Sequence, residues 1–148
     1  MKKPHVFQQI QLIFWFIFAA LLIFAVTAIM LAPKVNATIN WSPQDLETLK
    51  SVIVILALGG IPAGFIFHTH QVKKIPADIP LHNKLLQYRN SYFIKIVTLE
   101  ALAIIALIGH LISADKSFAI IFGLLFVAYT LNMPRWQNII KEINVVEE

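Results

Sequence analysis

The stretch YRNSYFIKIVTLEALAIIALIGHLI, residues 88–112, decides the fold of this chain. It starts with polar and aromatic residues and continues as an apolar run that contains one carboxylate, Glu100. A helix needs about 20 apolar residues to cross the hydrocarbon core of a bilayer. We therefore expect a transmembrane helix at about 91–112, with Glu100 close to the middle of the membrane.

Three further apolar runs predict three more spans, at about 10–31, 52–67 and 118–133. The first run is longer than the apolar part of a signal peptide, so we interpret it as a retained helix. Ser42, Pro43 and Asp45 form a capping-box-like start for the second helix, outside the bilayer. Pro134 ends the fourth span.

The composition agrees with this pattern. Of the 148 residues, 58% are hydrophobic and only 14% are charged, whereas about 25% of the residues in a soluble domain are charged. The chain has no cysteine, which excludes disulfides, iron–sulfur clusters and thiolate metal sites. The predicted fold class is an all-α polytopic membrane protein, a single domain built as a bundle of four transmembrane helices.

The distribution of Lys and Arg predicts the topology. Most of these residues lie in the N-terminal segment, the middle segment 68–90 and the tail 135–148. The two opposite loops contain only Lys34, Lys50 and Lys116. By the positive-inside rule both termini are cytoplasmic, 68–90 is a cytoplasmic loop with room for a short helix, and 135–148 is an amphipathic cytoplasmic tail. The formal charge of +4 is explained by these segments, so we expect the lipid bilayer as a partner and no nucleic acid.

Glu100 is the only acidic residue inside an apolar run. A charged side chain at the centre of a bilayer costs about 2.5–3.5 kcal/mol on insertion scales, so Glu100 should face other helices, be protonated or hold a cation. Two interpretations stay open. The carboxyl group binds a proton or a sodium ion, or it forms a hydrogen bond that joins two helices.

The second and third spans run antiparallel, so residues at the same depth in the membrane can be matched by counting from their shared end. This count places the middle of the second span beside Glu100. Four helix-packing candidates lie there: Gly59, Gly60, Pro62 and Gly64. Glycines four residues apart let two helices approach closely, and a proline leaves the carbonyl four residues earlier, on Leu58, without its helical donor. We hypothesise that protonated Glu100 packs on this surface and donates to the Leu58 carbonyl.

The other polar residues of the apolar runs and their borders give no cofactor site. Lys95 lies about 140° round the helix from Glu100, and we expect it to extend to the cytoplasmic headgroups. No two histidines lie at matching depth for a haem. His68, His70 and His82 come nearest to a metal site, but only Asp78 is close to them as a carboxylate. We expect no metal and no cofactor.

Two resemblances arise from these residues. The run 88–112, followed by a short turn and a last span that ends in MPR, is similar to an uncharacterised group of small bacterial four-span inner-membrane proteins, which implies a location in the bacterial inner membrane. TLEALAIIALIG, residues 98–109, resembles the glutamate-bearing helix of rotary-ATPase c subunits. That resemblance implies an ion-binding role for Glu100. The chain lacks the extended glycine run of those subunits, so a rotor ring is not implied.

Two functions therefore stay open. The protein is a proton- or cation-linked transport component that uses Glu100, or it is a non-catalytic accessory or assembly subunit of a larger membrane complex. Four helices leave little room for a solvated path in one protomer, so transport implies a homo-oligomer. A membrane enzyme acting on lipid or quinone is the least supported reading because no set of polar groups converges, and we expect no enzyme activity.

Overall fold

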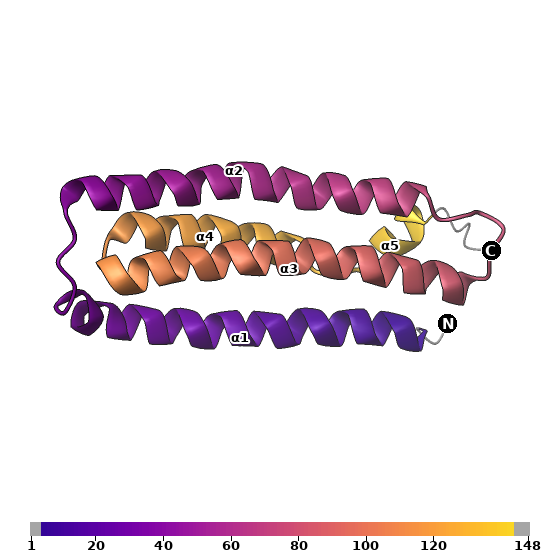
Figure 1. Cartoon of the computed structure of the whole chain (residues 1–148). Helices are drawn as coiled ribbons and strands as arrows, with labels where there is room; N and C mark the ends of the chain where they lie inside the picture. Colours follow the sequence, from indigo (N-terminus) through magenta and orange to yellow (C-terminus); the bar gives the residue numbers. More distant parts are fainter. Residues whose placement is uncertain (1–3, 144–148) are drawn as a thin grey trace.

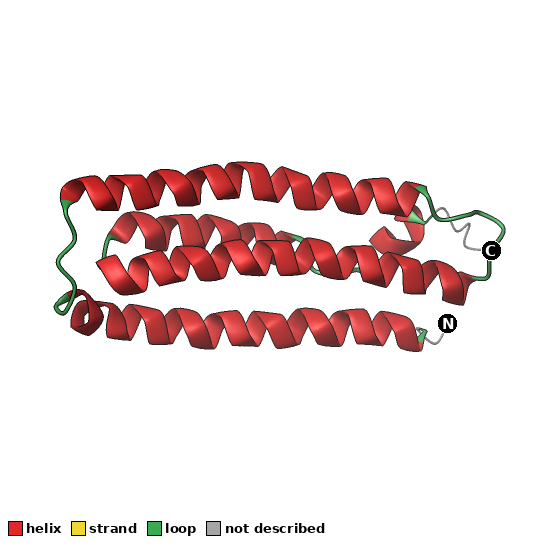
Figure 2. Cartoon of the chain, viewed as in Figure 1, coloured by secondary structure: helices red, strands yellow, loops and turns green. Residues whose placement is uncertain are grey.

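The computed structural model describes residues 4–143, and every regular element in this range is an α-helix (Figures 1 and 2). The five helices in chain order are α1 His5–Asn36, α2 Pro43–Lys73, α3 Leu81–Ser113, α4 Lys116–Leu131 and α5 Trp136–Glu142. Short connections join them, as the green segments of Figure 2 show. The predicted all-α class is confirmed for the described residues.

Local sequence signals set the ends of the helices. Ser42 Oγ accepts a hydrogen bond of 3.1 Å from the Asp45 backbone N–H, and Pro43 occupies the first turn of α2. This confirms the predicted helix start. Pro80 directly precedes α3, and Pro134 lies between α4 and α5. A proline has no backbone N–H to donate, so it is favoured at the start of a helix and in the segments between helices.

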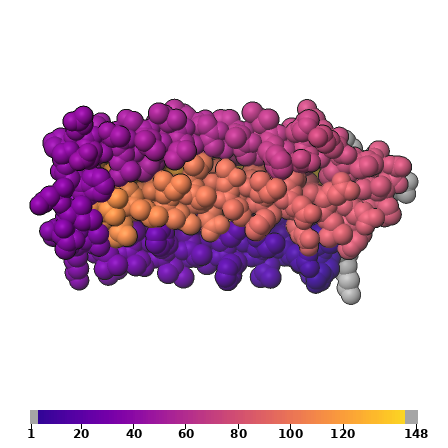
Figure 3. All heavy atoms as spheres, in the orientation of Figure 1, coloured from indigo at the N-terminus to yellow at the C-terminus, as the bar shows by residue number. Residues whose placement is uncertain are grey.

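Helix α3 lies at the centre of the bundle and contacts α1, α2 and α4. Figure 1 shows that α1 and α3 run in one direction, whereas α2 and α4 run in the other. On the face shown in Figure 3, α3 fills the space between α2 and α1. The α3 side chains with no exposed surface are Leu85, Ile96, Ala103, Ala106 and Leu107. Packing on three sides makes α3 the main contributor to the core.

Two glycines of α2 face α3. A Cβ on Gly60 would lie 2.9 Å from Leu102 Cδ1, and a Cβ on Gly64 would lie 3.5 Å from Thr98. The contact at Gly60 is too close for a larger residue unless Leu102 moves. Gly59, in contrast, has no neighbour within 4 Å. Small residues spaced four apart therefore allow close packing of α2 on α3 at the level of Thr98–Leu102.

Helix α4 is attached to both α3 and α1. A Cβ on Gly109 of α3 would lie 2.8 Å from the Phe118 ring of α4, so only glycine fits at this contact. Further along α4, the Tyr129 hydroxyl donates a 2.8 Å hydrogen bond to the Phe14 carbonyl of α1. The Tyr129 and Phe14 rings also stack, with centroids 4.8 Å apart. This pair joins α4 to α1 across the core.

Helices α1, α2 and α3 are each long and apolar enough to cross a membrane. Helices α4 and α5 pass the same test only together, as a pair bent by 77°. Large exposed apolar side chains lie along the middle of the bundle, among them Phe16 and Met30 on α1 and Leu58 on α2. Monomeric soluble proteins rarely expose so much apolar surface. The helices are therefore compatible with a small integral membrane protein.

The segment 68–90 differs from the loop that the sequence predicted. Helix α2 continues through His68 to Lys73 and α3 begins at Leu81, so only residues 74–80 form the connection. Polar residues end an apolar span, but they do not end a helix, because its backbone hydrogen bonds are internal. Val72 and Leu85 are buried, so the ends of both helices belong to the core.

The predicted tail also differs in its first part. Ile139, Ile140 and Ile143 are buried, and the Trp136 ring meets Phe7 of α1 edge-on at 5.3 Å. The apolar face of α5 is therefore covered by the bundle. Figure 1 shows α5 beside the ends of α2 and α3. Residues 144–148 of the predicted tail lie outside the described residues.

Charged contacts hold the opposite end of the bundle. Lys50 of α2 forms ion pairs with Asp115 at 2.8 Å and with Glu47 at 3.1 Å. Asp115 also caps α4, where it accepts a 2.8 Å hydrogen bond from the Ser117 N–H. The hydrogen bonds from Lys50 and then from Ser117 lower the pKa of Asp115 to about 2. The connection between α3 and α4 is thus bonded to α2.

Acid should weaken this end of the protein. The pKa of Asp115 is about 2 in the folded chain, and its ordinary value is 3.8. Folding favours the ionised carboxylate, so the stabilisation is complete above pH 3.8 and is lost as the pH falls toward 2. Asp115→Asn keeps a good helix cap and removes the charge. We expect this variant to have a lower thermal midpoint in nonionic detergent at neutral pH and a smaller loss of midpoint on acidification. If acidification lowers the thermal midpoint of wild type and of Asp115→Asn by the same amount, this role of Asp115 is contradicted.

Candidate functional site

A cluster of polar side chains lies at the end of the bundle that contains α5 and the connection between α2 and α3. His68 of α2 is at its centre, with a side chain that is only 4% exposed. His68 Nδ1 lies 3.0 Å from Ser91 Oγ of α3, and His68 Nε2 lies 3.3 Å from Glu142 Oε2 of α5. One imidazole ring therefore joins three helices.

Ser91 and Glu142 each present an oxygen to one nitrogen of the His68 ring. Ser91 Oγ donates to the Tyr88 carbonyl at 3.0 Å, which leaves its oxygen free to accept from Nδ1–H. An ionised Glu142 is an acceptor only, so Nε2 donates to it. Burial by itself would raise the pKa of Glu142, but the hydrogen bond and charge of His68 and the charge of Lys95 bring that pKa below its usual value. The contact is a charge-assisted hydrogen bond.

Two tyrosines of α3 form one wall of the cluster. The Tyr88 and Tyr92 rings stack with centroids 6.0 Å apart, and the His68 ring meets Tyr88 edge-on at 5.1 Å. The Tyr92 hydroxyl donates a 2.7 Å hydrogen bond to the Asn132 carbonyl, directly after α4. Tyr92 therefore fixes the break between α4 and α5 in place.

Lys95 enters the cluster from α3, next to Tyr92. It is 7% exposed, and Nζ lies 5.2 Å from the centre of the Tyr92 ring and 5.4 Å from that of Phe65. Within residues 4–143, Nζ makes no ion pair and no hydrogen bond. The expectation that the Lys95 side chain extends out of the bundle is wrong, because its ammonium group is held inside the bundle against two aromatic rings.

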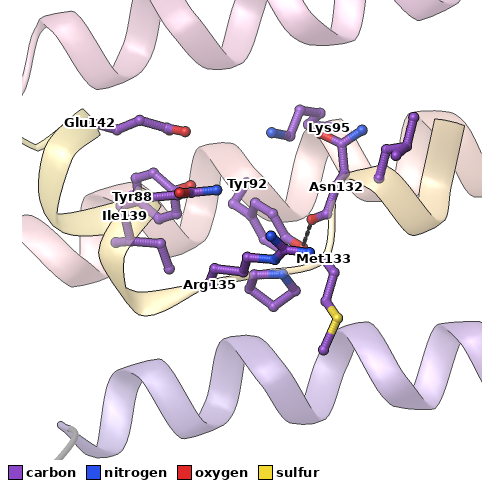
Figure 4. Close-up of a pocket in the computed structure, with 11 residues that line it drawn as sticks. Tyr88, Tyr92, Lys95, Asn132, Met133, Arg135, Ile139 and Glu142 are labelled. Carbon is purple, nitrogen blue, oxygen red and sulfur yellow. Dashed lines mark hydrogen bonds between the residues drawn. The ribbon is translucent and has the colours of Figure 1, made fainter.

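A cavity of about 120 Å³ lies between α3 and the segment that joins α4 to α5. Figure 4 shows the charged ends of Lys95 and Glu142 turned toward one another in this region. They do not form an ion pair. The cavity is lined by Tyr88, Tyr92, Lys95, Leu131, Asn132, Met133, Pro134, Arg135, Asn138, Ile139 and Glu142. Its volume equals that of about four water molecules.

The rim of the cavity has an apolar and a polar part. Leu131 is 80% exposed and Met133 is 36% exposed, and both belong to the apolar outer surface. Arg135 and Asn138 are also exposed. The neighbouring His68 directly follows the predicted second span. The cavity therefore lies where the apolar outer surface meets polar side chains.

The helical spacing in α3 was a signal that sequence reasoning missed. Positions 88, 91, 92 and 95 follow the i, i+3, i+4, i+7 pattern, so Tyr88, Ser91, Tyr92 and Lys95 share one face of a helix. The prediction for Lys95 rested on its position relative to Glu100 and did not use this shared face. No local pattern indicates Glu142, because the fold of α5 places it.

Glu100 lies outside this cluster and away from α2. The glycine surface of α2 packs on Thr98 and Leu102, which lie about 160° round α3 from Glu100. No hydrogen bond or ion pair joins Glu100 to any residue in 4–143. The hypothesised hydrogen bond to the Leu58 carbonyl is therefore not formed. Pro62 lies inside α2, which continues through it.

The structure does not bring the three predicted histidines together. His68 is buried and contacts Ser91 and Glu142, whereas His70 and His82 are exposed. In the part of the chain that the structure describes, no three His, Cys, Asp or Glu side chains could share a metal ion. The face of α2 that holds His70 is separate from the face that holds His68.

Replacing Glu100 should have little effect on the fold. An ionised carboxylate without a donor is costly in hydrocarbon, and Gln reproduces the shape of the neutral acid. We expect Glu100→Gln to change the free energy of unfolding by less than about 0.5 kcal/mol, as for substitutions outside a bonded network. The comparison is Gly60→Leu, which overpacks Leu102 and should cost about 1–3 kcal/mol. Circular dichroism in detergent measures both. An equal loss in the two variants would show that Glu100 holds the bundle together.

Comparisons with protein-family models, curated proteins and solved structures each found no match to this chain. An assignment of function therefore rests on the positions and chemistry of the side chains described above.

Proposed function

We propose that the chain is an integral membrane protein with four spans and that both of its ends lie on the cytoplasmic side. The 16 residues of α4 rise about 24 Å, and the extended segment that follows covers the remaining hydrocarbon thickness. Of the described Lys and Arg residues, those at 73, 74, 84, 89, 95, 135 and 141 lie toward the α5 end of the bundle, whereas 34, 50 and 116 lie toward the other. This asymmetry supports a cytoplasmic position for the α5 end.

Single cysteines test this topology, because the natural chain has none. Asn40→Cys lies in the connection between α1 and α2, and Ala77→Cys lies in the connection between α2 and α3. We expect a membrane-impermeant maleimide to label the first variant in intact bacterial cells and the second only after lysis. The opposite pattern would reverse the topology, and labelling of both variants in intact cells would contradict a membrane crossing by α2, the one helix between the two sites.

We further propose a non-catalytic function, in which the cavity binds the phosphate-bearing headgroup of a membrane lipid. The observation that carries this is the buried ammonium group of Lys95, which lines a cavity and has no anionic partner in contact. Removing an ammonium group from water costs several kcal/mol, and contact with aromatic rings returns about 0.5–2 kcal/mol. A phosphate group in the cavity would supply the missing charge.

The walls of the cavity suit such a ligand. Lys95 and Arg135 are cations, and the side chains of Asn132 and Asn138 can donate hydrogen bonds to phosphate oxygens. Exposed Leu131 on the rim places the acyl chains of a bound lipid beside the apolar surface of the protein. Only the headgroup has to enter, which agrees with the small volume of the cavity. The accessory role is favoured over ion transport because the cavity that Lys95 lines does not include Glu100.

Lipid retention by a Lys95 variant tests the proposal. Lys95→Met keeps the length of the side chain and removes the charge, and Lys84→Met is a matched control, because Lys84 is equally buried on α3 but does not line the cavity. We expect Lys95→Met, measured by native mass spectrometry with added phospholipid, to weaken lipid binding about tenfold, the loss of one charge-assisted hydrogen bond. Lys84→Met should bind like wild type.

Equal lipid binding by wild type and Lys95→Met would overturn the lipid-binding proposal. In a second experiment, inorganic phosphate is added to the lipid-bound protein to test whether it displaces the lipid. Displacement of lipid by millimolar phosphate would also count against the proposal, because the natural ligand would then be a soluble anion.

A further inference from the structure

We infer that the cavity selects a lipid headgroup with a primary ammonium group as well as a phosphate, such as phosphatidylethanolamine. This inference rests on the proposed lipid-binding function and adds the class of headgroup. The observation behind it is the pairing of opposite charges across the cavity: Lys95 on α3 and Glu142 on α5 both line it, and their charged ends face one another without contact (Figure 4).

Glu142 is the feature that discriminates between headgroups. One of its oxygens, Oε2, is bonded to His68, and the side chain is still 45% exposed, so the carboxylate is accessible to a ligand. A purely anionic headgroup near Lys95 would be repelled by this carboxylate. A headgroup with an ammonium end places its positive charge at Glu142 and its phosphate at Lys95.

Hydrogen-bonding capacity separates ethanolamine from choline. A primary ammonium group has three N–H donors, and a carboxylate has about four acceptor sites, which His68 and the nearby Tyr88 hydroxyl do not exhaust. A quaternary ammonium group has no N–H donor and three additional methyl groups. The cavity has a volume of about 120 Å³, so added methyl groups also meet a size limit. Both effects favour the primary amine.

The surrounding contacts fix Glu142 in position for this role. His68 is held by Ser91 on its other nitrogen, and the buried Ile139 and Ile140 anchor α5 to the bundle. The Tyr88 hydroxyl is also close to the Glu142 carboxylate. Binding of the amine would therefore require little rearrangement, which lowers the entropic cost of association.

The experiment compares three phospholipids with identical acyl chains, which carry ethanolamine, choline or glycerol headgroups. Purified full-length protein is titrated with each lipid and observed by native mass spectrometry. We expect wild type to bind the ethanolamine lipid about tenfold more tightly than the other two, the effect of about 1.4 kcal/mol. Glu142→Gln should remove this preference and improve binding of the glycerol lipid. Asp78→Asn, at the same end of the bundle but outside the cavity, should behave like wild type.

The outcomes separate this inference from the proposed function. Equal binding of all three lipids by wild type, with binding still dependent on Lys95, would overturn the headgroup selectivity and leave lipid binding intact. A preference for ethanolamine that persists in Glu142→Gln would also overturn it. If wild type retains no lipid, both the lipid-binding proposal and the headgroup selectivity are contradicted. Displacement of the lipid by soluble phosphoethanolamine at equal concentration would show that the headgroup alone is the ligand and would contradict a lipid source.

Discussion

The packing of α3 against three other helices is the constraint on which the rest of the structure depends. Each neighbour requires a different surface of the same helix, so α3 carries small residues, aliphatic residues and polar residues in separate stripes. Gly109 allows the close approach of α4, and the stripe at Thr98 and Leu102 accepts the glycines of α2. In a membrane, where lipid tails are as apolar as leucine, such close packing is what holds helices together.

The polar end of the bundle follows from the same helix. One stripe on α3 consists of Tyr88, Ser91, Tyr92 and Lys95. His68 of α2 contacts this stripe, and Glu142 of α5 contacts His68. Two of the contacts at this polar end have both a structural and a proposed binding role. The bond between His68 and Glu142 fixes α5 and also orients a carboxylate toward the cavity. The bond from Tyr92 to the Asn132 carbonyl holds the break after α4 and shapes the cavity wall. Stability and ligand binding are thus expected to share residues here, and a bound headgroup would stabilise the fold by mass action.

The two carboxylates of interest differ in their surroundings. Glu100 lies in the middle of α3 without a described hydrogen-bond partner, whereas Glu142 has a donor in His68 and a nearby cation in Lys95. An ionisable residue in a membrane protein is a functional candidate whose likely partner has to be named. The structure supplies partners to Glu142, and it covers Lys95 with aromatic rings at the edge of the same cavity. The functional centre that we propose therefore lies at the α5 end of the bundle.

The sequence by itself determined the helical class, the apolar spans and the start of α2 at Ser42, because these depend on composition, run length and local hydrogen bonds. It did not determine where α2 ends or α3 begins, since a helix continues beyond the hydrocarbon when its extension finds a core to join, as Val72 and Leu85 do. Only the tertiary structure decided the site. His68 and Glu142 are separated by 74 positions in the chain, and no periodic pattern relates them. They meet because α5 folds back across the end of the bundle to bury Ile139 and Ile140, and that burial depends on the shape of three other helices.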